Sequence, residues 1–95
     1  MTDSTTVVPP VLYLPLHRDS TEETRLVETR QLKDGRLALL AYTALDRLAT
    51  LCGENQPWLL TQTQTLDEIK KYQHFDVVIF DLEIPEQYRR EGRIA

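Results

Sequence analysis

The chain has 95 residues, of which 41% are hydrophobic, and its formal net charge of -4 comes from 15 acidic and 11 basic side chains. This length supports one domain and leaves no room for a second core. The longest apolar run covers only residues 37–42, far short of the roughly 20 residues that cross a bilayer. The acidic balance argues against a nucleic-acid surface, which needs a clustered basic face.

The first ten residues and the lone cysteine bear on the compartment. Residues 1–10 lack the basic start and apolar core of a secretory signal, and Cys52 has no second cysteine for an internal disulfide. We therefore expect a cytoplasmic protein. Because residues 1–10 are polar and end in two prolines, they predict a flexible tail. We expect the domain itself to span residues 11–84.

The N-terminal half predicts three strands. Residues 11–14 form a short β-prone run bounded by prolines, which is typical of an edge strand. Residues 24–32 mix β-branched and charged side chains and predict a strand with one wet face. Asp34 and Gly35 carry a hairpin-turn signal. Residues 37–42 are apolar on both faces, so they predict an interior strand.

A helix follows directly. Thr43 is a good N-cap residue, and Gly53 supplies the stop. The helical spacing i, i+3, i+4 and i+7 predicts one buried face made of Leu45, Leu48, Ala49 and Cys52.

The strand and helix then recur. Residues 57–61 predict a strand, and Thr65 opens a helix whose buried stripe is Leu66, Ile69 and Tyr72. Residues 76–81 predict a second interior strand. Residues 85–95 predict one or two helical turns, from Pro85 to Gly92, or a tail. The order indicates a single α+β domain in which an antiparallel meander precedes β-α-β-α-β on one mixed sheet, with the last three strands parallel.

No catalytic or metal-binding constellation is visible. Cys52 lies on the apolar face at a helix C-terminus, where the helix dipole opposes a thiolate, so we expect a buried structural thiol. His17 and His74 have no further ligands at metal-binding spacing. We therefore predict a protein that is not an enzyme and that has no metal and no cofactor.

The stretch FDVVIFDLEIPE resembles the phosphoacceptor strand of response-regulator receiver domains. On that resemblance Asp81 is the phosphoacceptor and Pro85 the loop proline. The first strand, however, is not followed by the acidic pair that holds magnesium. Only 14 residues follow Asp81, too few for the later strands that carry the hydroxyl and lysine residues. Phosphoryl transfer depends on those groups.

A second resemblance covers most of the domain, roughly residues 11–85. The stretch DGRLALLAYTALDRLATLCGENQPWLLT is similar to the central motif of the SseB-like N-terminal domain family, small and mostly uncharacterised bacterial proteins. The matching pairs are Gly35-Arg36, Tyr42-Thr43, Arg47-Leu48 and Pro57-Trp58. The resemblance implies a fold and no catalytic residue.

The function that we expect is a non-catalytic protein-interaction or accessory and regulatory domain. Its partner is another protein or a second copy of the chain in a homodimer, with no nucleic acid and no membrane. The alternatives are a phosphoacceptor or enzyme centred on Asp81 and a small-ligand sensor near Thr43, Thr61 and Asp81. The candidate interaction residues, drawn from an edge strand and a basic C-terminal segment, are Val11, Leu12, Tyr13, Leu14, Tyr88, Arg89 and Arg90.

Overall fold

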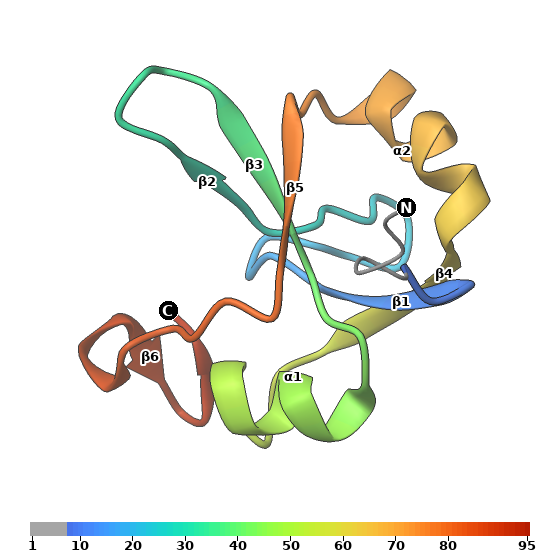
Figure 1. The fold of residues 1–95 in the computed structure, drawn as a ribbon. Coiled ribbons are helices and arrows are strands. Elements are labelled where there is room, and N and C mark those ends of the chain that lie inside the picture. The colour runs from blue at the N-terminus through green and yellow to red at the C-terminus, as the bar shows by residue number, and fades with distance from the viewer. Residues whose placement is uncertain (1–7) are drawn as a thin grey trace, which may run out of the picture.

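The structure is a computed structural model and describes residues 8–95 (Figure 1). It is a single α+β domain, as predicted. Two short 3₁₀ turns, at Thr63–Thr65 and Glu86–Tyr88, accompany the helices and strands. In chain order the helices and strands are β1 (Val11–Pro15), β2 (Thr29–Gln31), β3 (Leu37–Ala41), α1 (Leu45–Cys52), β4 (Trp58–Gln62), α2 (Leu66–Tyr72), β5 (Val77–Phe80), β6 (Arg89–Arg90) and β7 (Arg93–Ile94).

The strands pair in three groups. A mixed sheet has the order β2-β3-β5, with β3 antiparallel to β2 and parallel to β5. β1 and β4 form a separate antiparallel ribbon, and β6 and β7 form a hairpin. The expectation that the last three long strands run parallel is therefore wrong for β4. Its side chains alternate between exposed and half-buried, the pattern of a ribbon with one wet face.

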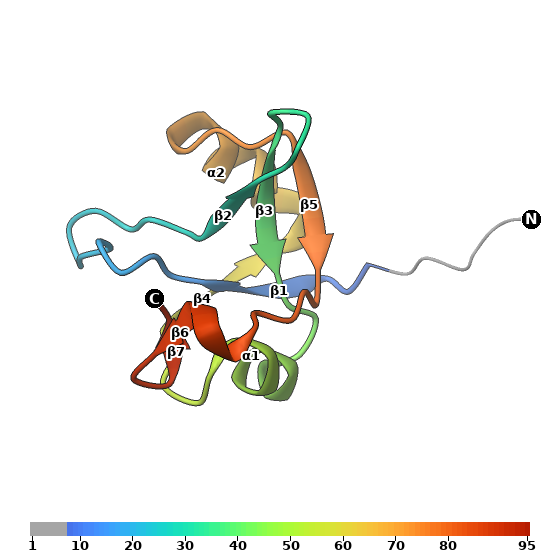
Figure 2. The ribbon, with the colours of Figure 1, turned by 90° about the vertical axis from the view of Figure 1, so that its left-hand side faces the viewer.

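The ribbon joins the sheet through β1. The amide N–H of Tyr13 donates to the carbonyl oxygen of Tyr42, and that of Tyr42 donates to the carbonyl oxygen of Tyr13, each over 2.9 Å. A bridge between Leu16 and Val27 adds a second link. Figure 2 shows the ribbon lying between the three-stranded sheet above and α1 with the C-terminal hairpin below.

β3 separates two apolar clusters, as expected of an interior strand. Leu39 and Ala41 pack on one side, against side chains of β1 and Phe75. Leu40 and Tyr42 pack on the other. This second cluster is completed by Leu48, Cys52, Ile84 and Ile94. The buried position predicted for Cys52 is confirmed.

The helices differ in detail from the prediction. Ala44, not Thr43, occupies the N-cap of α1, and Gly53 ends the helix at a φ of 136°. Leu48 and Cys52 are buried, but Leu45 is 40% exposed. Tyr72 of α2 was expected in a buried stripe, yet it is 88% exposed. Periodicity placed these residues on a helix correctly, but neither helix is covered on the side where Leu45 and Tyr72 project.

β5 is an edge strand and not an interior one. Its only strand neighbour in the described part of the chain is β3. Its side chains are half-buried or, at Phe80, exposed. The continuous apolar run was misleading because the side chains of β5 are partly covered by the two clusters that flank β3. No described strand pairs with the second edge of β5.

The C-terminal segment belongs to the domain. The expected one or two helical turns are a single 3₁₀ turn followed by the β6–β7 hairpin. Glu91 and Gly92 both have positive φ, the geometry of a two-residue hairpin turn. Ile94 is 2% exposed in the second cluster. The domain therefore extends beyond residue 84.

The predicted tail falls mostly outside the described residues. Of its last part, Pro9 and Pro10 accept hydrogen bonds from the hydroxyl and amide groups of Thr63, which hold them against the end of β4. Between residues 8 and 95, no helix is long and apolar enough to span a membrane.

The close approach of Gly53 to the C-terminal hairpin predicts a strong substitution effect. A Cβ at this position would clash with the carbonyl oxygen of Gly92. We expect Gly53→Ala to lower the free energy of unfolding by about 3 kcal/mol, because a positive φ and a backbone clash act together. Urea denaturation measures the change.

Gly35→Ala is the matched control. Gly35 also has a positive φ, of 93°, but a Cβ there has open space. It should cost only about 1 kcal/mol. Equal losses for the two variants would contradict the role of the Gly92 contact.

Candidate interaction surface

The predicted interaction strand, residues 11–14, is not a free edge. Leu12 and Leu14 are fully buried in the core and cannot contact a partner. One edge of β1 pairs with β4, and the other is occupied where Tyr13 exchanges hydrogen bonds with Tyr42 and where Pro15 accepts one from Glu28. The strand that has an open edge is its neighbour, β4.

The backbone of β4 shows which residues face outward. Thr63 and Leu16 form hydrogen bonds across the two ends of the ribbon, to Pro10 and Pro57. Because hydrogen-bonded pairs alternate in an antiparallel ladder, Leu59 and Thr61 then face β1. Trp58, Leu60 and Gln62 direct their backbone N–H and C=O groups away from it. In residues 8–95 no strand lies on that side.

The outer face of the ribbon is apolar. Leu60 is 51% and Trp58 40% exposed. The ring of Trp58 packs edge-on against Tyr13, with centroids 5.3 Å apart and an angle of 73° between the ring planes. Neither β1 nor β4 carries a charged residue, although 27% of the chain is charged. Edge strands normally carry charge that prevents pairing, so this edge is unprotected.

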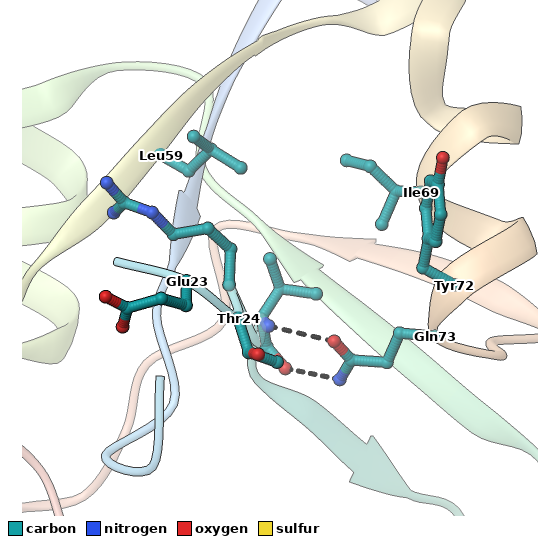
Figure 3. Close-up of a pocket in the computed structure, with 8 residues that line it drawn as sticks. Glu23, Thr24, Leu59, Ile69, Tyr72 and Gln73 are labelled. Atoms are coloured by element: carbon teal, nitrogen blue, oxygen red, sulfur yellow. Dashed lines mark hydrogen bonds between the residues drawn. The ribbon is translucent and has the colours of Figure 1, made fainter. Parts of the chain in front are cut away.

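A groove of about 340 Å³ opens beside β4 (Figure 3). Leu59 lies on one side, Ile69 and Tyr72 of α2 on the other, and Val27 is among the lining residues. Gln73 holds this arrangement, because its side-chain amide accepts a hydrogen bond from the Val27 N–H (3.0 Å) and donates one to the Val27 carbonyl (2.7 Å). The groove is thus preformed and mostly apolar.

Asp81 serves as a fixed hydrogen-bond acceptor. Its carboxylate accepts from the backbone N–H of Thr43 (3.0 Å), from the Thr43 hydroxyl (2.9 Å) and from Arg47 (3.1 Å). These bonds tie the end of β5 to the start of α1. The expected ligand site at Thr43, Thr61 and Asp81 is not assembled, because Thr61 lies in the ribbon and bonds to Thr65.

Of the two predicted basic residues, Arg89 supports the fold with its side chain. The Arg89 guanidinium donates to the carbonyl oxygens of Thr50 and Leu51 at the C-terminus of α1, and to that of Ile84. It therefore supplies the positive charge that the last turn of α1 lacks. Arg90 is exposed, and its carbonyl accepts a hydrogen bond from Arg18. Tyr88 is exposed on the 3₁₀ turn.

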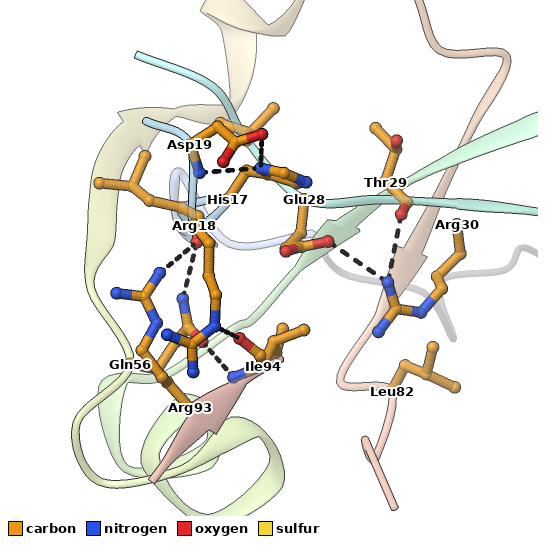
Figure 4. A network of polar contacts seen from close by, with 12 residues as sticks. His17, Arg18, Asp19, Glu28, Thr29, Arg30, Gln56, Leu82, Arg93 and Ile94 are labelled. Atoms are coloured by element: carbon orange, nitrogen blue, oxygen red, sulfur yellow. Dashed lines mark hydrogen bonds and ion pairs between the residues drawn. The ribbon is translucent and has the colours of Figure 1, made fainter. Parts of the chain in front are cut away.

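A polar network lies beneath the hairpin (Figure 4). Gln56 is buried, donates to the Leu16 carbonyl and accepts from the Ile94 N–H, so it fastens the hairpin to the end of β1. Glu28 is also buried and contacts Arg30 at 3.3 Å. Burial raises the pKa of the Glu28 carboxyl, although nearby His17 and Arg30 partly oppose the rise. Neither network residue was found from the sequence.

The thiol of Cys52 and the two histidines make separate contacts. Burial raises the pKa of the Cys52 thiol, and the sulfur is closed off in the second cluster. His17 accepts a hydrogen bond from the Asp19 N–H, and His74 pairs with Asp76 at 3.0 Å. Among residues 8–95, no group of three or more potential ligand side chains is placed to hold a metal ion.

The comparisons with known proteins gave no match: no family model, curated protein or solved structure is similar to this chain. The resemblance to the SseB-like family therefore stays a prediction.

The bonds to Asp81 predict a structural role that can be measured. We expect Asp81→Ala to lower the free energy of unfolding by about 2 to 3 kcal/mol, because it leaves the Thr43 N–H without its acceptor and places alanine at a φ of 56°. Asp81→Asn keeps one acceptor and tolerates that φ, so it should cost about 1 kcal/mol or less. Equal losses in urea denaturation would contradict this role.

Glu28 predicts a pH dependence. A carboxyl whose pKa is raised by folding binds a proton in the folded state while the unfolded chain has released it, so stability falls as the pH rises above the ordinary value of 4.5. Glutamine cannot ionise and removes this loss. The stability of Glu28→Gln relative to wild type should therefore increase between about pH 4 and about pH 7. Urea denaturation at several pH values measures it, and a difference that shrinks as the pH rises would contradict the prediction.

Proposed function

We propose that this protein is a non-catalytic interaction domain, with an accessory or regulatory role, that binds an extended protein segment along the open edge of β4. One observation carries the proposal: an uncharged edge strand presents outward backbone groups next to two exposed large apolar side chains, Trp58 and Leu60. Strand addition uses such an edge, since the backbone supplies the hydrogen bonds and alternate side chains supply selectivity.

Both faces of an added strand find contacts here. Side chains on its outer face lie beside Trp58 and Leu60, and aromatic anchors of this kind are frequent in protein interfaces. Side chains on its inner face lie toward the groove next to Leu59 and Ile69. The reduced, buried Cys52 is compatible with the cytoplasm, which we propose as the compartment.

The groove supports a second candidate, a sensor of small apolar ligands. Its volume of about 340 Å³ falls in the range of small-molecule sites, and Gln73 and Arg25 provide polar groups at an apolar floor. Thermal denaturation with a panel of metabolites tests this candidate. A rise in melting temperature that Ile69→Ala abolishes supports it, whereas unchanged melting across the panel counts against it.

The main proposal predicts a selective loss of binding. Leu60→Lys places a charge on the open edge, which is how natural edge strands prevent pairing. We expect it to reduce capture of the partner from an extract of the native host by about tenfold or more. Quantitative mass spectrometry of the captured proteins provides the measurement.

Leu45→Lys is the matched control, since Leu45 is a similarly exposed leucine on α1. It should retain the partner, and circular dichroism should show both variants folded. If the two variants capture the same proteins in the same amounts, β4 is not the docking edge.

A further inference from the structure

We infer that the segment bound by β4 is β4 of a second copy of this chain, in antiparallel orientation about a two-fold axis through Leu60. The inference rests on the proposed function, because it uses the same edge, and it names the partner. The resulting assembly is a four-stranded antiparallel sheet in which the two β4 strands are central and the two β1 strands flank them.

The outward backbone groups of β4 fit this register. A two-fold axis at Leu60 sets it opposite the partner's Leu60, and Trp58 opposite the partner's Gln62. These are the three residues whose N–H and C=O groups face away from β1. All three pairs are then hydrogen-bonded pairs, which gives roughly six hydrogen bonds between the copies. The Gln62 carbonyl also accepts from Thr65, and a carbonyl oxygen has a second lone pair for the partner.

The absence of charge favours a second copy over an unrelated partner. On the two-fold axis, a charged side chain faces the same charge on the other copy, and directly opposed like charges destabilise a sheet. A partner of different sequence imposes no such restriction and commonly adds complementary charge. Residues 55–66 contain no charged side chain, in a chain that is 27% charged. An uncharged residue at the axis meets this requirement, and an edge free of charge leaves no like-charge contact in any nearby register.

The open edge of β5 lacks this property. The Asp81 N–H donates to Ala41 of β3, so by alternation Val77 and Ile79 bond to β3. Only Val78 and Phe80 of β5 direct backbone groups outward. Asp76 and Asp81 bound the strand. In an antiparallel pair of β5 strands, Asp76 of one copy approaches the partner's Asp81. Acids flanking an apolar strand in this way discourage pairing.

The exposed side chains indicate what the pairing covers. Leu60, which is 51% exposed, meets the partner's Leu60, and the Trp58 ring lies over the aliphatic stem of the partner's Gln62. One strand pair makes a small interface, so the dimer should form and dissociate with concentration.

Light scattering coupled to size exclusion tests the dimer. Between about 10 and 500 µM, we expect the mass of wild type to rise from 11.1 kDa toward twice that value, while Leu60→Lys stays at the monomer mass. Leu45→Lys, exposed on α1, should behave like wild type.

Cysteine cross-linking tests the register. Opposed residues of an antiparallel pair have Cβ atoms about 5 Å apart, close enough for a disulfide once the side chains adjust. We expect Leu60→Cys to form a covalent dimer under mild oxidation, and Phe80→Cys, which places the thiol on β5, to stay monomeric. Wild type is the blank, since its only thiol is fully buried.

The outcomes separate this inference from the proposed function. A monomer at every concentration overturns the dimer, and so does cross-linking of Phe80→Cys without cross-linking of Leu60→Cys. If the monomeric wild type captures a host protein that Leu60→Lys does not, the dimer is overturned and the proposed function stands. A monomer without any Leu60-dependent partner overturns both.

Discussion

The paired hydrogen bonds between Tyr13 and Tyr42 connect the ribbon to the mixed sheet, and much of the molecule depends on them. They occupy the outer edge of β1 and leave β4 as the ribbon's open side. The Tyr42 hydroxyl also donates to the Leu82 carbonyl, which fixes the path of the chain after β5. Together with the Leu16–Val27 bridge and the Glu28–Pro15 hydrogen bond, the Tyr13–Tyr42 pair fixes how the two β units meet and which edge of the ribbon stays open.

Local sequence patterns predicted the helices and strands better than they predicted which strands pair with one another. The turn at Gly35, strand β3 and the stop of α1 at Gly53 follow from short-range chemistry, and each is present. The pairing of β4 with β1 is a long-range choice, and a five-residue strand carries little information about it. The side chains of β4 alternate between exposed, as at Trp58 and Leu60, and half-buried. This alternation identifies a solvent-facing side only when β4 is known to lie in a ribbon.

The predictions for Leu12, Leu14 and Arg89 failed for a related physical reason. Arg89 was expected to be an exposed cation, but the open carbonyl oxygens of α1 are strong acceptors, and a guanidinium 38 residues away in sequence satisfies them. Leu12 and Leu14 lie on an edge-like strand, yet their side chains face the core. Sequence indicates which residues can make contacts, whereas the fold determines which contacts are already made. The uncharged run of residues 55–66 is the sequence feature that coincides with the open β4 edge.

The dependence of α1 on Arg89 has a consequence for synthesis. An eight-residue helix is unstable alone, so α1 needs the guanidinium and the apolar contact of Ile94 to hold its shape. Both residues lie in the β6–β7 hairpin, which emerges from the ribosome after the other helices and strands. For that interval the nascent chain presents its open β4 edge while part of its core is unfinished. The open β4 edge is thus also the segment most in need of protection from aggregation as the chain is made.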